Sequence, residues 1–266
     1  MLDSFDQKKA QILAEIATTN EANPDLSPKG TIDELCLPIM NSINSHRDMI
    51  TTSSCSGRVS VFLEGDKKGS SKIGAKGVGG HWLFVTHDKK QVPHWWKNID
   101  FENHVENSNF KPSRFVLFKF EPLILHVKCR DLTTSQKLYQ TAMSCGFRES
   151  GIGVNNIVGI RISIKLDIPI GYLNEEGKCV LLVNENYLEF IDNQAINRFN
   201  ENEFKLNLLH RKISDIMFAG QELTTEETKN ERRDRKRREG LAKKEALMKE
   251  REKKLGMVKD AEAEHS

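Results

Sequence analysis

The sequence has no long run of apolar residues, although 38% of its 266 residues are hydrophobic. A membrane-spanning helix needs about 20 consecutive apolar residues, and no segment approaches that length. The N-terminal MLDSFDQKKAQ also lacks the apolar stretch of a secretory signal peptide. We therefore expect a soluble protein of the cytoplasm.

Cysteine is scarce, with five residues scattered singly along the chain. An odd number at these spacings argues against a disulfide framework, and no CxxC pair indicates a zinc site. His126 and Cys129 lie three residues apart on a predicted strand, so their side chains point to opposite faces and do not bind one ion together. We expect reduced thiols and no bound metal.

Nucleotide-binding motifs are also missing, despite a glycine-rich loop over residues 65–80. GSSKIGA, which starts at Gly69, has the glycine spacing of a phosphate-binding loop, but Ala75 stands where a lysine is required. GAKGVGG runs into a predicted strand and lacks the GxGxxG order of a dinucleotide-binding turn. We interpret the loop as a flexible connection.

The chain does contain an irregular succession of helical and strand patterns. These patterns predict helices over residues 5–17, 31–44, 133–145, 187–199 and 205–217, and strands over residues 58–64, 81–87, 113–121, 122–131, 155–171 and 178–183. The order favours an α+β fold over the regular alternation of a doubly wound parallel sheet. We expect one domain over residues 1–220 and a charged tail, helical or disordered, over residues 221–266.

Two of the predicted strands carry polar side chains on one face only. His126, Lys128 and Arg130 alternate with apolar residues in LILHVKCR, and Arg161 and Ser163 do the same in GIRISIKLDI. An ordinary solvated sheet face explains this pattern as well as a binding site does.

The stretch TSSCSGR places a turn-like run of small residues before an apolar strand. We interpret its serines and glycine as donors of hydrogen bonds to a ligand, and Arg58 as a partner for a phosphate or carboxylate. Arg148, in GFRESG, adds a further arginine near a glycine turn. Cys55 is alternatively a nucleophile activated by a histidine elsewhere, although a buried, inert thiol is the commoner case.

Two further features point toward nucleic acid. RRDRKRR, residues 232–238, carries six positive charges against one negative charge, which suits a phosphate backbone. A nuclear localisation signal or a solvated helix is the competing explanation. Trp95 and Trp96 are candidates for stacking on bases, but adjacent tryptophans are as often part of a core.

Several segments resemble, in the same order, the wybutosine-synthesis protein 3 family. They are TSSCSGR, GGHWLFVTH, ILHVKCRDL, GFRESGI and IRISIKLDIPIG, with DLSPKGTID as an N-terminal match. The resemblance covers roughly residues 5–215, so it gives no role to the tail. It implies a barrel-like, mostly antiparallel sheet with packed helices and an internal duplication, unlike the Rossmann-type methyltransferases.

The resemblance also implies an activity. The family uses S-adenosylmethionine to methylate the N4 nitrogen of a 4-demethylwyosine-type base at position 37 of phenylalanine tRNA. Its partner is therefore the anticodon loop, where a base is accessible without melting a duplex. Neither a membrane nor an obligate protein partner is implied.

Candidate site residues follow from setting this chemistry against the sequence. The accepting nitrogen must lose a proton, and a neutral histidine is a suitable acceptor at pH 7. We expect His126, beside Arg130, to be the first candidate for the catalytic role and His87 the second. The residues expected to bind the cofactor are Ser54, Cys55, Ser56, Gly57, Arg58, His81, Trp82, Arg148, Ser150, Gly151, Arg161 and Ser163.

Two alternatives stay open at this point. A tRNA-binding module without catalysis would use the same arginines but would not bind S-adenosylmethionine. A Cys55-dependent transferase would lose all activity on replacement of that cysteine.

Overall fold

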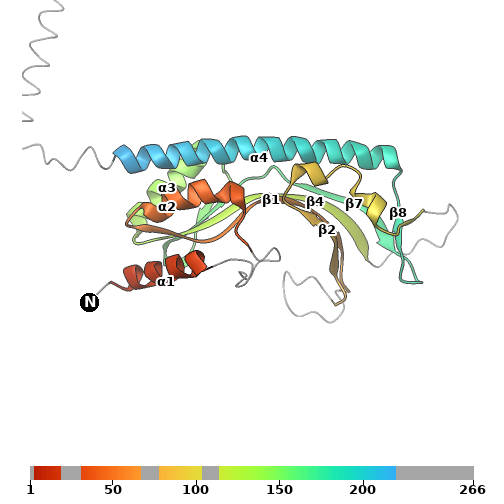
Figure 1. Ribbon diagram of the computed structural model, residues 1–266, viewed down its shortest axis with the longest axis horizontal. Coiled ribbons are helices and arrows are strands. Elements are labelled where there is room, and N and C mark those ends of the chain that lie inside the picture. Colours follow the sequence, from red (N-terminus) through yellow and green to blue (C-terminus); the bar gives the residue numbers. More distant parts are fainter. Residues whose placement is uncertain (1–2, 19–30, 67–77, 104–113, 220–266) are drawn as a thin grey trace, which may run out of the picture. The chain divides into compact units, whose positions relative to one another are not determined.

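The computed structural model describes residues 3–18, 31–66, 78–103 and 114–219 (Figure 1). Contacts divide the chain into two units, Met1–Met217 and Phe218–Ser266, and the fold below is that of the first. The predicted tail, residues 221–266, and most of the predicted glycine loop lie outside the described residues.

The first unit has an α+β fold, as predicted. Its α-helices are α1 (Ser4–Thr18), α2 (Leu37–Ser45), α3 (Leu132–Ser144) and α4 (Glu185–Ala219), and its short 3-10 helices are η1 (Glu34–Cys36), η2 (Lys89–Gln91), η3 (Trp95–Asn98) and η4 (Val154–Asn156). Its strands are β1 (Met49–Leu63), β2 (His81–Thr86), β3 (Glu102–Asn103), β4 (Phe115–Cys129), β5 (Gly151–Ile152), β6 (Ile157–Arg161), β7 (Leu166–Leu173) and β8 (Cys179–Leu181). None of the helices in the described part of the chain is long and apolar enough to cross a membrane.

The strands form one curled sheet in the order β2-β1-β4-β7-β8-β3, with β6 on the remaining half of β4 and β5 on β6. Among the described strands every pairing is antiparallel except that of β3 with β8. The sheet is therefore a mostly antiparallel half-barrel and not a Rossmann-type arrangement. The internal duplication implied by the resemblance stays a prediction.

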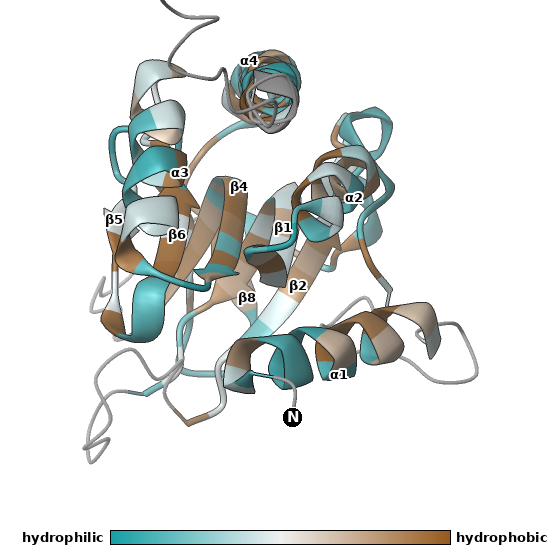
Figure 2. Cartoon of the chain, turned by 90° about the vertical axis from the view of Figure 1, so that its left-hand side faces the viewer, coloured by the Kyte–Doolittle hydropathy of each residue, from teal (hydrophilic) through white to brown (hydrophobic). Residues whose placement is uncertain are grey.

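Helix α4 runs along the sheet and covers both halves of its apolar face (Figures 1 and 2). One core cluster joins Leu206 and Leu209 of α4 to β4, β6, α2 and α3, and the other joins Leu188 and Ile191 to β1, β4 and η3. Viewed along α4, α2 lies on the β1 side and α3 on the β6 side. One long helix thus replaces the two segments predicted over residues 187–217.

Three other predictions need correction. The strands predicted over 113–121 and 122–131 are one strand, β4, which continues through Pro122. The strand predicted over 155–171 is two strands, β6 and β7, separated by residues 162–165. TSSCSG is not a turn, because it lies within β1 and pairs with β4. The irregular backbone expected of its small residues occurs inside the strand, as a bulge at Thr52 and a positive φ at Gly57.

The two adjacent tryptophans belong to the core. Trp95 and Trp96 are 2% and 5% exposed, so neither is available for stacking on a base. The Trp95 indole donates a hydrogen bond to Asp192 of α4 at 3.0 Å. The interpretation of the two tryptophans as part of the core is therefore confirmed.

Candidate active site

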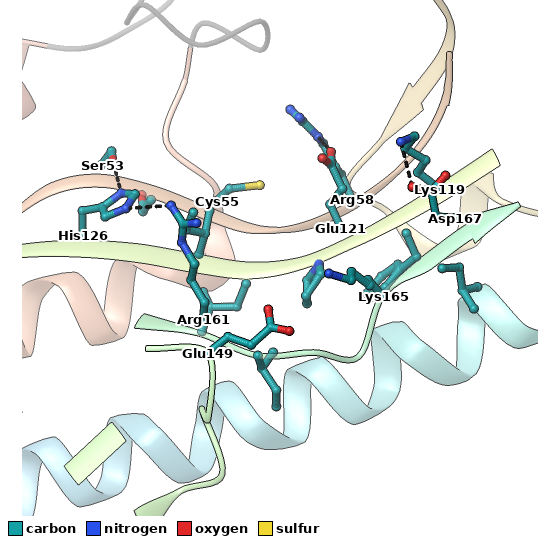
Figure 3. A pocket seen from close by; sticks show the side chains of 17 residues that line it. Ser53, Cys55, Arg58, Lys119, Glu121, His126, Glu149, Arg161, Lys165 and Asp167 are labelled. Atoms are coloured by element: carbon teal, nitrogen blue, oxygen red, sulfur yellow. Dashed lines mark hydrogen bonds and ion pairs between the residues drawn. The ribbon is translucent and has the colours of Figure 1, made fainter. Parts of the chain in front are cut away.

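A pocket of about 490 Å³ forms where β6 and β7 separate (Figure 3). Strand β4 pairs with β7 up to Phe120 and with β6 from Ile124 onward, so residues 121–123 lie between the two pairings. The walls come from β1, from β4, from the segment between β6 and β7 with its flanking residues, and from Glu149. The lining residues are Ser53, Ser54, Cys55 and Arg58, then Lys119, Phe120, Glu121, Pro122, Leu123, Ile124 and His126, then Arg161, Ile162, Lys165, Leu166 and Asp167. The break in the sheet is thus what creates the pocket.

Asn202 of α4 holds the sheet together at this break. Its side chain is 2% exposed, accepts a hydrogen bond from the Leu123 backbone N–H at 2.7 Å and donates one to the Ser56 carbonyl at 2.7 Å. Gly57, with φ of +106°, leaves room for this amide, because a Cβ there would lie 3.1 Å from the Asn202 nitrogen. Backbone groups that would otherwise be buried without partners are satisfied from the helix side.

His126 lies on the pocket wall between Ser53 and Arg161 (Figure 3). Its Nδ1 is 2.7 Å from the Ser53 hydroxyl, and its Nε2 is 3.3 Å from an Arg161 guanidinium nitrogen. A guanidinium can only donate, so Nε2 accepts and Nδ1 carries the proton. Partial burial, followed by the Arg161 charge, lowers the pKa of His126 and keeps the imidazole neutral.

Ion pairs occupy the opposite rim. Arg58 donates to Glu121 at 2.7 Å, and its guanidinium carbon lies 5.2 Å from the Trp82 ring centroid. Lys119 pairs with Asp167 at 3.0 Å. The carboxylate that pairs with Arg58 is therefore that of Glu121 in the same chain, and this pair fixes the guanidinium at the edge of the pocket.

A second group of reactive side chains lies beside the pocket wall. The thiol of Cys55 and the Oδ2 of Asp33 are each 3.7 Å from Nε2 of His87. Asp33 is 7% exposed, and its Oδ2 accepts a hydrogen bond from the Ser56 backbone N–H at 2.8 Å. Burial raises the pKa of Cys55, so the thiol stays protonated at neutral pH.

Five of the predicted site residues line the pocket: Ser54, Cys55, Arg58, His126 and Arg161. His87 reaches it indirectly through Cys55. The predicted residues that do not line it are Ser56, Gly57, His81, Trp82, Arg130, Arg148, Ser150, Gly151 and Ser163. Among these, Ser150 still supports the wall, because its hydroxyl accepts a hydrogen bond from the Arg161 N–H at 3.1 Å.

Arg130, expected beside His126 in the catalytic role, has a different environment. Its guanidinium pairs with Asp3, directly before α1, with Asp6 of α1 and with Asp48, the last at 2.7 Å, and lies over the Phe5 ring. Strand parity placed Arg130 on the polar face correctly. Three carboxylates from two distant segments, residues 3–6 and Asp48, bind it, and sequence periodicity contains no sign of these contacts.

The pocket also contains residues that sequence reasoning did not assign to the site. The polar ones are Ser53, Lys119, Glu121, Glu149, Lys165 and Asp167, and the apolar ones are Phe120, Pro122, Leu123, Ile124, Ile162 and Leu166. Lys165 and Asp167 share the polar face of GIRISIKLDI with Arg161, and Glu149 adjoins Arg148 and Ser150, so local patterns contained the signal. Asp33 lies in the quoted motif DLSPKGTID, but nothing in that motif indicated a site role, because its partner His87 is 54 positions away.

Comparison with known proteins gives a consistent result. The family model described as Methyltransferase TYW3 matches residues 7–215. The chain is 49% identical to "tRNA wybutosine-synthesizing protein 3" of Saccharomyces cerevisiae, covering 90% of this chain and 94% of that protein. It is 38% identical to the protein of the same name from Schizosaccharomyces pombe, covering 79% and 86%.

A solved structure is similar as well. The PH1069 protein from Pyrococcus horikoshii OT3 superposes with a TM-score of 0.59 at 28% identity, covering 80% of this chain and 95% of that one. The fold described above is therefore shared with an experimentally determined structure.

Proposed function

The chain belongs to the TYW3 methyltransferase family, and on that premise we propose that it transfers a methyl group from S-adenosylmethionine to a base of tRNA. The acceptor we propose is the N4 nitrogen of the 4-demethylwyosine-type base at position 37, in the anticodon loop of phenylalanine tRNA. Wybutosine synthesis is the process named for the relatives. The cytoplasm is the compartment we propose, since all five cysteines are free thiols.

The pocket residues suit S-adenosylmethionine. Arg161 and Lys165 offer positive charge for its carboxylate, and Glu149 offers negative charge for its ammonium group. Pro122, Ile162 and Leu166 supply apolar surface for a flat ring, and about 490 Å³ is a usual volume for a small-molecule site. When bound, this cofactor supplies an electrophilic methyl group on a sulfonium.

Proton removal is the step for which the chain supplies its own chemistry. A base that accepts a proton from the acceptor nitrogen ends as an imidazolium, so the neighbouring charges decide which histidine serves. Beside His126, the Arg161 cation opposes a positive charge. Beside His87, the Asp33 carboxylate, 3.7 Å from Nε2, stabilises a positive charge.

We therefore assign the base to His87 and reverse the order expected from the sequence. The observation that supports this assignment is that His87 pairs with Asp33 and at the same time contacts Cys55, which lines the pocket. His126 becomes a positioning residue, because its Nε2 accepts from Arg161 and so directs that guanidinium into the pocket. Positioning of this kind dominates a methyl transfer, which needs an in-line approach of the two reacting atoms.

The test is methyl transfer from labelled S-adenosylmethionine to tRNA from cells blocked just before this step, run beside fully modified tRNA. Label should enter only the blocked tRNA. His87→Gln should lower kcat by at least about 100-fold, the usual contribution of a general base, with tRNA binding retained. His126→Gln should mainly raise the KM for the methyl donor.

Each alternative gives a different outcome. A large loss of kcat in His126→Gln, with normal turnover in His87→Gln, would show that His126 and not His87 is the general base. A thiol nucleophile predicts complete loss in Cys55→Ser, whereas our assignment predicts measurable activity because a hydroxyl preserves the polar contact. Binding of tRNA without any labelling would indicate a module without catalysis.

A further inference from the structure

Three side chains of different chemistry converge beside the pocket. Asp33 precedes η1, Cys55 lies in β1 and His87 follows β2, so the folded sheet brings together residues from three segments. Their donor atoms, one oxygen, one sulfur and one nitrogen, all lie within 4.8 Å of one another. Both the carboxylate and the thiol approach the same ring atom, Nε2 of His87, at 3.7 Å.

That convergence differs from the arrangement of a catalytic triad. In a triad the nucleophile contacts one ring nitrogen and the carboxylate contacts the other. Here both partners lie near a single nitrogen, and the three donor atoms form a small triangle with every side within 4.8 Å. Donor atoms that surround a common point are the arrangement that a bound cation requires.

The spacing agrees with a tetrahedral metal site. Zinc–sulfur bonds of about 2.3 Å and zinc–nitrogen or zinc–oxygen bonds of about 2.0 to 2.2 Å place neighbouring donors about 3.3 to 3.7 Å apart. Two of the three separations are 3.7 Å and need only a few tenths of an ångström of adjustment. The third, from the Cys55 sulfur to the Asp33 oxygen, is at most 4.8 Å and shortens by up to about 1.3 Å when a metal binds. The Ser56 backbone N–H, 2.8 Å from the Asp33 oxygen, supplies the outer hydrogen bond that orients a ligating carboxylate.

We propose that Asp33, Cys55 and His87 bind one thiophilic divalent cation, with Zn²⁺ preferred, through three protein ligands and one open position. A thiolate together with an imidazole selects zinc over the hard cations Mg²⁺ and Ca²⁺. On binding, the Cys55 thiol loses its proton to solvent and its sulfur forms the metal bond. The fourth position is left for water.

Occupation of this site has a consequence that rests on the proposed function. A cation bound to Nε2 of His87 occupies the lone pair that would accept the substrate proton. Zinc should therefore inhibit methyl transfer reversibly, and a chelator should restore it. The binding site itself does not depend on that assignment, because it follows from donor geometry alone.

Binding is tested with the metal alone, on the reduced, chelator-treated full chain and without tRNA. Zn²⁺ should bind with one tight site in calorimetry, and Co²⁺ should produce a thiolate-to-metal charge-transfer absorption. Cys55→Ser should abolish that absorption, and His87→Gln and Asp33→Asn should each weaken binding by at least about 10-fold. Cys179→Ser is the matched control, since this half-buried thiol lies in β8.

Two results would overturn the proposal. One is a charge-transfer absorption that persists in Cys55→Ser, and the other is no Zn²⁺ binding by a folded parent protein. Melting curves of the metal-free variants identify any that fail to fold, and the variants that do fold decide the case. Zn²⁺ that binds without inhibiting would remove His87 as the base and leave the metal site standing. Absence of Zn²⁺ binding by the folded parent protein would overturn only the metal site, because the assay of methyl transfer from labelled S-adenosylmethionine tests the proposed function separately.

Discussion

Asn202 shows how a residue that need not touch a ligand builds a pocket. At the break in the sheet, Leu123 has an N–H and Ser56 a carbonyl that lie under α4, away from water. A carboxamide supplies one acceptor and one donor from the same side chain, so it satisfies both strands at once. An apolar residue would leave both backbone groups unpaired, and a carboxylate would set an oxygen against the Ser56 carbonyl.

Asn202→Ala should therefore destabilise the protein by about 2 to 4 kcal/mol, because each buried polar group left without a partner costs about 1 to 3 kcal/mol. The free energy of unfolding in urea measures this loss. Asn207→Ala is the control on the same helix, and it should change stability by less than about 0.5 kcal/mol because Asn207 is exposed. Equal effects of the two substitutions would mean that the bridge contributes nothing.

At the scale of elements, α1 is fastened to the sheet largely by charge. Arg130, directly after β4, binds Asp3, directly before α1, and Asp6 of α1, and it also pairs with Asp48. Lys9 of the same helix donates to the backbone carbonyls of His46 and Met49. Of the residues in α1, only Phe5 is buried, so apolar packing provides little of the attachment.

Arg130→Met should loosen α1 while it keeps an apolar contact with Phe5. We expect only a small loss of global stability, since exposed ion pairs are screened by solvent and each contributes little. Hydrogen exchange should show the α1 amides losing protection before the rest of the domain. Lys128→Met, on the same strand face, is the control. A uniform change across the domain would show that Arg130 does not act through α1.

The same attachment should weaken in acid. Partial burial alone would raise the pKa of Asp48, but hydrogen bonds from Arg130 and Arg47 lower it below its usual value. A depressed carboxyl pKa stabilises the folded state above the unfolded value of about 3.9, and this stabilisation disappears as the pH falls through the folded value. In Arg130→Met this contribution should be smaller.

Local patterns predicted most elements but not their continuity. Strand parity identified the buried and polar faces of β4 correctly, because alternation depends only on neighbouring residues. Whether the segments 113–121 and 122–131 form one strand depends on β1, which pairs with both. Whether the segment 155–171 is interrupted depends on where β4 changes its partner from β7 to β6. At that point β4 binds Asn202, which lies in a helix that begins 14 positions after the segment ends.

At the scale of the whole molecule, the site depends on long-range contacts. Ser54, Cys55, Arg58, His126 and Arg161 could be found from the sequence because they stand on polar strand faces or in the quoted motifs. Asp33 also stands in a quoted motif, DLSPKGTID, but its place in the site could not be inferred from it, since only the folded sheet brings it to His87. The same cause misplaced Arg130, whose carboxylate partners lie more than 80 positions away.

Charge is also distributed unevenly over the whole chain. Residues 221–266 hold 14 Lys and Arg against 12 Asp and Glu, which accounts for the entire net charge of +2. Six of those cations lie within residues 232–238. Contacts with phosphates release counterions, so the salt dependence of binding reports how many cations take part.

Removal of residues 221–266 should therefore weaken tRNA binding and lower the slope of log K against log salt concentration by at least about 2, since each phosphate contact contributes about 0.7 to 0.9. Filter binding over a range of salt concentrations measures both quantities.

Replacing the six cations of RRDRKRR by Gln should reproduce most of the effect. The matched control replaces six other cations, Lys243, Lys244, Lys249, Lys253, Lys254 and Lys259, by Gln. If the two sets lower the slope equally, the tail acts through its summed charge and not through this cluster. If neither set nor the truncation changes the slope, the tail does not contact phosphates, and the cations of the folded domain carry the binding alone.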